Sequence, residues 1–175
     1  LGKELINKNP EESFANFKKS ADQGYEKAQL RVAISYQSGI NGAKKSIEEA
    51  NRYYQLAADQ GNVKAQCNLA FNMQKGDGIK KDLKVANDLY KKSADNGYAI
   101  AQFNYAYNLM NGIGIDKDQT EASKYFKLAA DQGLPNAQYS YGINLMKGNG
   151  VEKDPVEGCK YLKKSADSGN AQAQC

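Results

Sequence analysis

A four-residue motif recurs at an almost constant interval, and it constrains the fold more than any other feature of the chain. Ala-Asp-Gln-Gly begins at Ala21, Ala58 and Ala130, and variants with Asn or Ser at the third position begin at Ala94 and Ala166. The closing glycines are separated by steps of 37, 36, 36 and 36 residues. Self-similarity at such a period is typical of a solenoid, in which each repeat is one supersecondary unit stacked on its neighbours.

Each repeat has the periodicity of two helices, here called helix A and helix B. In the second repeat, helix A is predicted over about 63–74, with an apolar stripe at spacings i, i+4, i+5 and i+8. The stripe consists of Ala65, Leu69, Ala70 and Met73, and it recurs as Ala28, Val32, Ala33, Tyr36; Ala101, Tyr105, Ala106, Leu109; and Ala137, Tyr141, Gly142, Leu145. Helix B carries a second apolar stripe, for example Ala50, Tyr53, Tyr54, Ala57 and Ala58.

Turn and cap residues punctuate these helices. Helix A is expected to end at a left-handed glycine, namely Gly39, Gly76, Gly112 and Gly148 in turn. Helix B is expected to begin after an N-cap at Ser46, Asp82, Asp118 and Asp154, with capping boxes completed by Glu49, Glu121 and Glu157. Asn9 and Pro10 predict an earlier helix start of the same kind.

The predicted fold is therefore all-α: an α-α superhelix, or solenoid, of about four and a half two-helix repeats of 36 residues. We expect a single array over 1–175, made of a half repeat (1–24), four repeats (25–61, 62–97, 98–133 and 134–169) and the start of a further repeat (170–175). The chain opens at Leu1 without Met and stops at Cys175 as a repeat begins. We therefore expect it to be a fragment of a longer protein.

Composition argues against an enzyme. The 175 residues include no His, which removes the commonest general base and the commonest metal ligand. No pair of carboxylates stands out from the repeating pattern, so we predict no catalytic residue, no metal site and no cofactor. The Gly-x-Gly loops follow helices rather than strands and recur as turn chemistry, which argues against a phosphate site.

Charge and hydropathy exclude further classes. The net charge of +4 comes from 24 basic and 20 acidic residues interspersed along the chain, which is not the footprint of a nucleic-acid binder. No apolar run approaches the ~18 residues of a membrane helix, and no signal peptide is evident, so we expect a soluble segment without membrane insertion. The compartment is not predicted.

The three cysteines, Cys67, Cys159 and Cys175, do not follow the repeat. Their odd number argues against a disulfide framework, so we interpret them as small apolar fillers on helix faces. A pairing of Cys159 with Cys175 across the last glycine turn is left as an alternative.

The repeat resembles a known family. In the last full repeat, the residues that carry the resemblance are Ala137, Tyr141, Gly142, Leu145, Gly148, Gly150, Val151 and Asp154. On these residues the chain is similar to the Sel-one-like (Sel1-like) repeats, a branch of the tetratricopeptide-like (TPR-like) superfamily. It departs from the family in its helix A pairs, which read Val-Ala, Leu-Ala, Tyr-Ala and Tyr-Gly in place of Leu-Gly, and in lacking Trp. The resemblance implies an adaptor that assembles other proteins.

The resemblance also implies that helix A lines a concave groove. Beside its core stripe, helix A has a second face at +3, +7, +10, +11 and +14 from each tetrad glycine. The candidate ligand-binding residues on this face are Lys27, Arg31, Ser35, Lys64, Asn68, Phe71, Asn72, Lys75, Asn104, Tyr107, Asn108, Asn144 and Lys147. Asn is a poor helix former, and its amide can hold the backbone of an extended peptide. The alternative is that Asn, frequent throughout the chain, fills solvated positions.

The function predicted is a non-enzymatic protein–protein interaction scaffold that binds a peptide or a partner protein in this groove. One alternative is a structural spacer or oligomerisation module that makes contacts through helix B or its open ends. A further alternative, suggested by the resemblance, is a regulator of a cell-wall or degradation enzyme. The sequence identifies neither the partner nor the oligomeric state.

Overall fold

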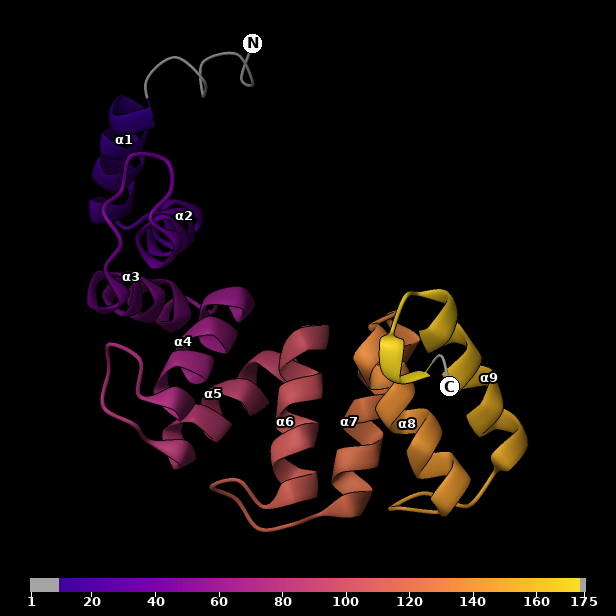
Figure 1. Ribbon diagram of the computed structural model, residues 1–175. Helices are drawn as coiled ribbons and strands as arrows, with labels where there is room; N and C mark the ends of the chain where they lie inside the picture. Colours follow the sequence, from indigo (N-terminus) through magenta and orange to yellow (C-terminus); the bar gives the residue numbers. More distant parts are fainter. Residues whose placement is uncertain (1–9, 174–175) are drawn as a thin grey trace. The chain divides into compact units, whose positions relative to one another are not determined.

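The structure, a computed structural model, describes residues 10–173. Within this range it consists of α-helices, one short 3-10 helix and connecting turns, and it contains no strand (Figure 1). The helices are α1 (Pro10–Asp22), α2 (Glu26–Ser38), α3 (Ile47–Asp59), α4 (Val63–Lys75), α5 (Leu83–Asp95), α6 (Ala99–Asn111), α7 (Gln119–Asp131), α8 (Pro135–Lys147), α9 (Pro155–Asp167) and η1 (Ala171–Ala173). The prediction of an all-α repeat fold is confirmed.

The chain divides into two compact units, with the boundary between Ala86 and Asn87, inside α5. In unit 1, α1 packs on α2, α2 on α3 and α3 on α4. In unit 2, α6 packs on α7, α7 on α8 and α8 on α9. Helices α2, α4, α6 and α8 are the predicted helices A, and α3, α5, α7 and α9 are the predicted helices B. Within each unit these helices pack on their sequence neighbours, as expected of a stacked repeat.

The predicted apolar stripes form the core. Ala65, Leu69, Ala70 and Met73 of α4 are all buried, as is the stripe of α3. Tyr36 is only half-buried, and its ring packs edge-on against that of Phe14 and nearly parallel to that of Tyr53. Leu89, Leu162 and Ala166, also predicted for the core, are half-buried.

The small residue of helix A marks a close helix–helix approach. A Cβ atom added at Gly142 of α8 would lie 2.9 Å from Leu162 Cγ and 3.1 Å from the carbonyl oxygen of Gly158, both in α9. A Cβ atom added at Gly158 would in turn lie 3.0 Å from the carbonyl oxygen of Gly142. The absence of side chains at these two positions lets the backbones of α8 and α9 pack closely.

The glycine C-caps are confirmed. Helices α2, α4, α6 and α8 end at residues with φ between 65° and 81°, the left-handed region that favours glycine. The predicted N-caps are also confirmed, because Ser46, Asp118 and Asp154 accept hydrogen bonds from the third residue of the following helix, and Asp82 accepts from Val85 N. Pro10 begins α1, and Asn9 lies outside the described residues.

The capping boxes, in contrast, are incomplete: the side chain of the N-cap residue accepts its hydrogen bond, but the glutamate side chain does not accept the reciprocal one. The backbone N–H of Asp118 donates to the carbonyl of Leu109 at 3.1 Å, and that of Asp154 donates to Leu145 at 2.9 Å. The glutamate side chain was predicted to accept these bonds. It does not, because the loop returns each cap residue to the end of helix A, where a backbone carbonyl already satisfies its N–H. Glu157 pairs instead with Lys160.

In the loops after α4 and α8, the second glycine contacts the preceding repeat. A Cβ atom added at Gly78 would lie 2.9 Å from the backbone at the start of α3, and one added at Gly150 would lie 1.9 Å from the carbonyl oxygen of Gln119 at the start of α7. Both glycines have positive φ, 60° and 66°. The loop of one repeat therefore lies directly on the first turn of helix B in the repeat before it, and only glycine fits there.

In three of the four repeats, a tyrosine of helix B links the repeat to the aspartate of the preceding tetrad. The hydroxyl of Tyr53 donates to Asp22 Oδ1 at 2.6 Å, that of Tyr161 to Asp131 Oδ1 at 2.7 Å, and that of Tyr125 to Asp95. Lysines four residues before these aspartates add ion pairs, of which Lys127 with Asp131 is one.

These contacts shift the acid–base equilibria of the residues involved. Burial acts to raise the pKa of Asp131, but the hydrogen bonds from Lys127 and Tyr161 outweigh it and hold the pKa below its usual value. Burial, followed by the bond to Asp95, raises the pKa of Tyr125 to about 12. The tyrosine–aspartate link is therefore strongest where the phenol is neutral and the carboxylate is ionised.

The cysteines behave differently from one another. Cys67 is buried, as predicted for a small apolar filler, but Cys159 is exposed and the prediction is wrong for it. The buried residues of α9 include Gly158, and one step along a helix turns the next side chain by about 100°, which directs Cys159 to solvent. Cys175 and its suggested pairing with Cys159 lie outside the described residues.

The first prediction concerns the two glycines of the last loop. Gly150→Ala should lower the free energy of unfolding by about 3 kcal/mol or more, because a methyl group there overlaps the backbone of α7 in addition to straining a positive φ. Gly148→Ala is the matched control. Its φ is also positive, but its nearest contact would be 3.4 Å from Lys153 Cβ, so we expect a loss of about 1 kcal/mol. Equal losses in urea unfolding would contradict the backbone contact.

The second prediction concerns pH. A carboxylate whose folded pKa is lowered contributes stability above its unfolded pKa, and this is lost as pH falls through the folded pKa. Tyr161→Phe should therefore cost about 1 kcal/mol at neutral pH, a modest value because Asp131 is half exposed, and less as the pH falls through the lowered folded pKa of Asp131. Tyr25→Phe, at an exposed tyrosine, is the control. A cost that does not change with pH would disprove the role of Asp131.

Candidate functional site

The predicted binding face of helix A is only partly exposed. Positions on helix A are again counted from the glycine that closes the preceding tetrad. At position +10, Ile34, Phe71 and Tyr107 are 38%, 42% and 49% exposed, which is unusual for large apolar side chains at one position of a repeat. At +7, Arg31 is exposed, whereas Asn68 and Asn104 are half-buried. The lysines at +3 and +14, which are Lys27, Lys64, Lys75 and Lys147, are exposed.

The prediction for the residues at position +11 is wrong. Ser35, Asn72, Asn108 and Asn144 were predicted to face a ligand, but each is between 2% and 5% exposed. Position +11 lies one residue beyond +10, so it points about 100° away from the exposed row and toward helix B. These four side chains therefore do not form an accessible ladder. The alternative, that these Asn residues fill solvated positions, is wrong as well.

The buried amides connect helix A to helix B and to the loop. Asn72 Nδ2 donates to Asn51 Oδ1 of α3 at 2.7 Å, and Asn51 Nδ2 donates to the carbonyl oxygen of Asp77 at 2.8 Å. In unit 2, Asn108 donates to Asn87 at 2.8 Å, and Asn87 donates to the carbonyl of Ile113 at 2.7 Å. We call this two-step chain the amide relay.

The last repeat has the same relay with a different middle residue. Asn144 Nδ2 donates to Ser123 Oγ at 2.7 Å, and Ser123 Oγ donates to the carbonyl of Asn149 at 2.6 Å. In the first repeat the direction of the hydrogen bond is reversed, because Asn41 of the longer loop donates to Ser35 Oγ at 3.2 Å. The polar residues at +11 therefore hold the loop onto the helix pair, and this structural role accounts for the recurring Asn.

The basic residues of unit 1 contact aromatic rings. The guanidinium of Arg31 lies 4.9 Å from the ring centroid of Phe17, and Lys75 Nζ lies 4.2 Å from that of Phe71. Helices α2 and α4 contain one acidic residue, Glu26, which accepts a hydrogen bond from Asn62. The helix A faces of unit 1 are therefore basic.

The helix A faces of unit 2 are almost uncharged. Helix α6 contains no charged residue, and α8 contains only Lys147, in its last turn. The two units thus present chemically different surfaces at the same registers of the repeat.

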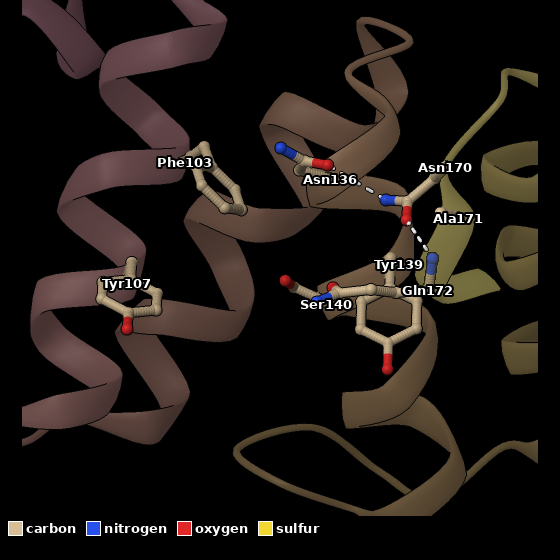
Figure 2. A pocket seen from close by; sticks show the side chains of 8 residues that line it. All are labelled: Phe103, Tyr107, Asn136, Tyr139, Ser140, Asn170, Ala171 and Gln172. Atoms are coloured by element: carbon tan, nitrogen blue, oxygen red, sulfur yellow. Dashed lines mark hydrogen bonds between the residues drawn. The ribbon is translucent and has the colours of Figure 1, made fainter.

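A hollow of about 420 Å³ lies between α6 and α8 of unit 2. Figure 2 shows Phe103 and Tyr107 on α6 at one side, and Asn136, Tyr139 and Ser140 on α8 at the other, with Asn170, Ala171 and Gln172 closing one end. A second hollow of about 200 Å³ shares Tyr107, Tyr139 and Ser140 and extends toward Asn111 and Ile143. We call the two together the aromatic groove.

Sequence reasoning identified only part of the aromatic groove. Of the predicted site residues, Tyr107 lines both hollows, and the side chain of Asn144 reaches the smaller one while bonded to Ser123. The aromatic side chains at +6, Phe103 and Tyr139, were missed. The signal was present, because Phe103 and Tyr107 are four residues apart and therefore share one helix face. Their ring centroids lie 6.5 Å apart.

The polar groups of the groove are partly engaged. Asn170 Nδ2 donates to Asn136 Oδ1 at 3.0 Å, and Gln172 N donates to Asn170 Oδ1 at 2.9 Å (Figure 2). Among residues 10–173, the hydroxyls of Tyr107, Tyr139 and Ser140 have no hydrogen-bond partner. The groove therefore offers aromatic faces and hydrogen-bond donors. Such a combination of aromatic side chains and a few polar groups is typical of binding pockets.

Two further searches of the described residues bear on function. No cluster of three or more His, Cys, Asp or Glu side chains within 10–173 is arranged to hold a metal ion. In the same range, every helix is too short or too polar to cross a lipid bilayer.

Comparison with protein families matches the chain to the Sel1 repeat. The family model aligns with five consecutive segments, residues 1–25, 26–62, 63–98, 99–134 and 135–170. No curated protein matched the chain.

Solved structures show the same fold. The chain is 31% identical to a Sel1 repeat protein from Oxalobacter formigenes, with a TM-score of 0.86, and the match covers 95% of this chain and 66% of that one. It is 30% identical to c5321, a protective antigen of uropathogenic Escherichia coli with an SLR fold, with a TM-score of 0.89 and coverage of 95% and 35%. Cysteine-rich protein B of Helicobacter pylori is 19% identical, with a TM-score of 0.57 and coverage of 74% and 96%, and shows the fold alone. This chain thus spans about two thirds of the Oxalobacter formigenes protein and about one third of c5321.

The third prediction tests the amide relay. Asn72→Leu should lower the free energy of unfolding by about 2 kcal/mol, because it leaves Asn51 Oδ1 buried without a donor. The double variant Asn51→Leu, Asn72→Leu should cost less than the two single losses combined, by about 1 kcal/mol or more. Asn16→Leu, at an exposed Asn of α1, should change stability by less than about 0.5 kcal/mol. Additive losses, or a neutral Asn72→Leu, would show that the relay does not hold the loop.

Proposed function

Because the chain belongs to the Sel1 repeat family, whose members are generally protein–protein interaction modules, we propose that it is a non-enzymatic scaffold that binds a segment of a partner protein in the aromatic groove. The observation that carries the proposal is the hollow of about 420 Å³ between α6 and α8, with Phe103, Tyr107 and Tyr139 at its walls. Its volume falls within the range of about 300–1,000 Å³ typical of ligand sites.

The chemistry of the walls supports this choice. Tyrosine and phenylalanine are enriched in protein interfaces, since a ring adds a large contact area at a small cost in conformational entropy. Tyr107 is half exposed in spite of its size, so its ring already faces solvent and can be covered by a partner without rearranging the core. The three hydroxyls without partners add directional contacts to this apolar surface.

The predicted contact set changes accordingly. Ser35, Asn72, Asn108 and Asn144 have a structural role, and we propose Phe103, Asn136, Tyr139 and Ser140 as contacts beside Tyr107. The remaining predicted residues stay candidates for partner contacts outside the groove: Asn104 and Lys147 in unit 2, and Lys27, Arg31, Lys64, Asn68, Phe71 and Lys75 in unit 1. In unit 1, the exposed cations would favour an acidic segment.

The alternative of a spacer or oligomerisation module has weaker support. Helix B exposes large apolar side chains, of which Leu56, Leu128 and Val156 are examples. They occur singly on helices that otherwise present charged residues, and isolated exposed apolar residues are normal on protein surfaces. The groove, in contrast, gathers three aromatic side chains in one place.

The fourth prediction tests the proposed function. Peptides selected from a random displayed library on the immobilised chain should include a class whose affinity falls about tenfold or more in Tyr107→Ser, the equivalent of about 1.4 kcal/mol. Phe71→Ser is the matched control, because it changes the same register of the repeat in unit 1, and we expect it to leave that class unaffected. Both residues are more than two fifths exposed, so the fold should tolerate either change.

Two outcomes would contradict the proposal. One is a selection that yields no binding peptide above background. The other is a set of peptides that bind wild type and Tyr107→Ser equally well, which would place the binding surface elsewhere on the chain.

A further inference from the structure

The aromatic groove is neutral, and this property restricts what it can bind. Helix α6 has no charged residue, and the single charge of α8, on Lys147, lies in the last turn, three residues beyond Asn144. No charged residue lines either hollow. A carboxylate or ammonium group entering the groove would lose hydration without gaining an opposite charge, which is costly. The occupant is therefore uncharged over the part that enters.

The length of the groove matches a short extended segment. The lining residues of α6 run from Phe103 to Asn111 across the two hollows, which corresponds to about 12 Å along the helix axis. An extended polyproline II segment rises ~3.1 Å per residue, so about four of its residues span this distance.

The polar groups of the groove include several free donors. Asn136 Oδ1 accepts from Asn170, and the amide hydrogens of Asn136 remain available to donate. Asn170 Oδ1 accepts from Gln172 N. The hydroxyls of Tyr107, Tyr139 and Ser140 can each donate a hydrogen bond. A ligand that presents acceptors matches these donors.

A proline-containing segment has these properties. Its backbone forms no internal hydrogen bonds, so its carbonyls are free acceptors, and each proline lacks an N–H. Proline rings pack on aromatic side chains, and the preformed conformation reduces the entropy lost on binding. We propose that the aromatic groove recognises an uncharged, proline-containing extended segment of a partner protein. This inference rests on the proposed function and specifies its ligand.

A neutral oligosaccharide is the nearest competing ligand, because sugars also stack on aromatic rings. The proposed partner is a protein, because the chain belongs to a family of protein–protein interaction modules. The peptide is therefore the ligand proposed, and an oligosaccharide is included below as a probe.

The fifth prediction uses the chain labelled with ¹⁵N and titrated with defined probes. The first probe is a peptide of about ten residues alternating Pro-Pro-Ala, and the others are a Gly-Ser peptide of equal length, a Pro-Pro-Glu peptide and a neutral glucose tetrasaccharide. The Pro-Pro-Ala peptide should shift amide signals of α6 and α8, and its affinity should exceed that for each other probe by about tenfold or more. Its Kd should change less than about twofold between about 50 and 500 mM NaCl, since no charge pair forms.

A matched pair of variants locates the site. Ser140→Arg should reduce the affinity for the Pro-Pro-Ala peptide by about tenfold or more, because it places a charge in the groove. Arginine already occupies this register in α2 as Arg31, so the repeat accommodates it. Asn16→Arg introduces the same residue at an exposed position of α1, in unit 1, and should leave the affinity unchanged.

The outcomes separate the two proposals. Stronger binding of the Glu-containing peptide, the Gly-Ser peptide or the tetrasaccharide would overturn the inference, as would an affinity that Ser140→Arg does not reduce. If library selection yields peptides that depend on Tyr107 but are acidic or lack proline, this inference fails while the proposed function stands. If no peptide depends on Tyr107, the proposed function itself fails.

Discussion

The structure depends on how each loop is held against the helix A that precedes it and the helix B of the preceding repeat. Asn72 of α4 donates to Asn51 of α3, and Asn51 donates to the carbonyl of Asp77, so one buried side chain from each of these helices fixes the loop that follows α4. A buried polar group without a partner is costly, and here each member satisfies the next. The fixed loop then places its second glycine, Gly78, on the first turn of α3. Local hydrogen bonding thereby sets the stacking of successive repeats.

The same arrangement determines which side chains are available for binding. With +11 turned inward to the amide relay, the outward side of helix A is left to +6, +7 and +10. The residues at those registers differ from repeat to repeat. In unit 1 they carry Arg31 and Phe71 beside exposed lysines, and in unit 2 they carry Tyr107, Tyr139 and Ser140 with no adjacent charge. A uniform scaffold thus presents two different surfaces.

Much of the fold could be predicted because its determinants are local. The glycine C-caps, the N-caps at Ser46 and Asp118 and the apolar stripe of α4 follow from spacing along one helix. The site was harder to predict because packing between helices decides which side chains are buried and which are exposed. Asn72 and Phe71 are adjacent in sequence, and only the position of α3 shows that one is buried and the other exposed. The half-formed capping boxes have the same origin, since the carbonyl that replaces the glutamate comes from the preceding helix.

The central claim is that the asparagines at +11 are internal structural residues while the binding chemistry lies at the neighbouring registers. Hydrogen exchange of the side-chain amides, followed by NMR, tests it most directly. The account predicts that the Nδ2 hydrogens of Asn72, Asn108 and Asn144 exchange about a hundredfold or more slowly than those of Asn136, which faces solvent at the aromatic groove. Exchange of Asn144 as fast as that of Asn136 would contradict it, because the amide relay would then be open to water.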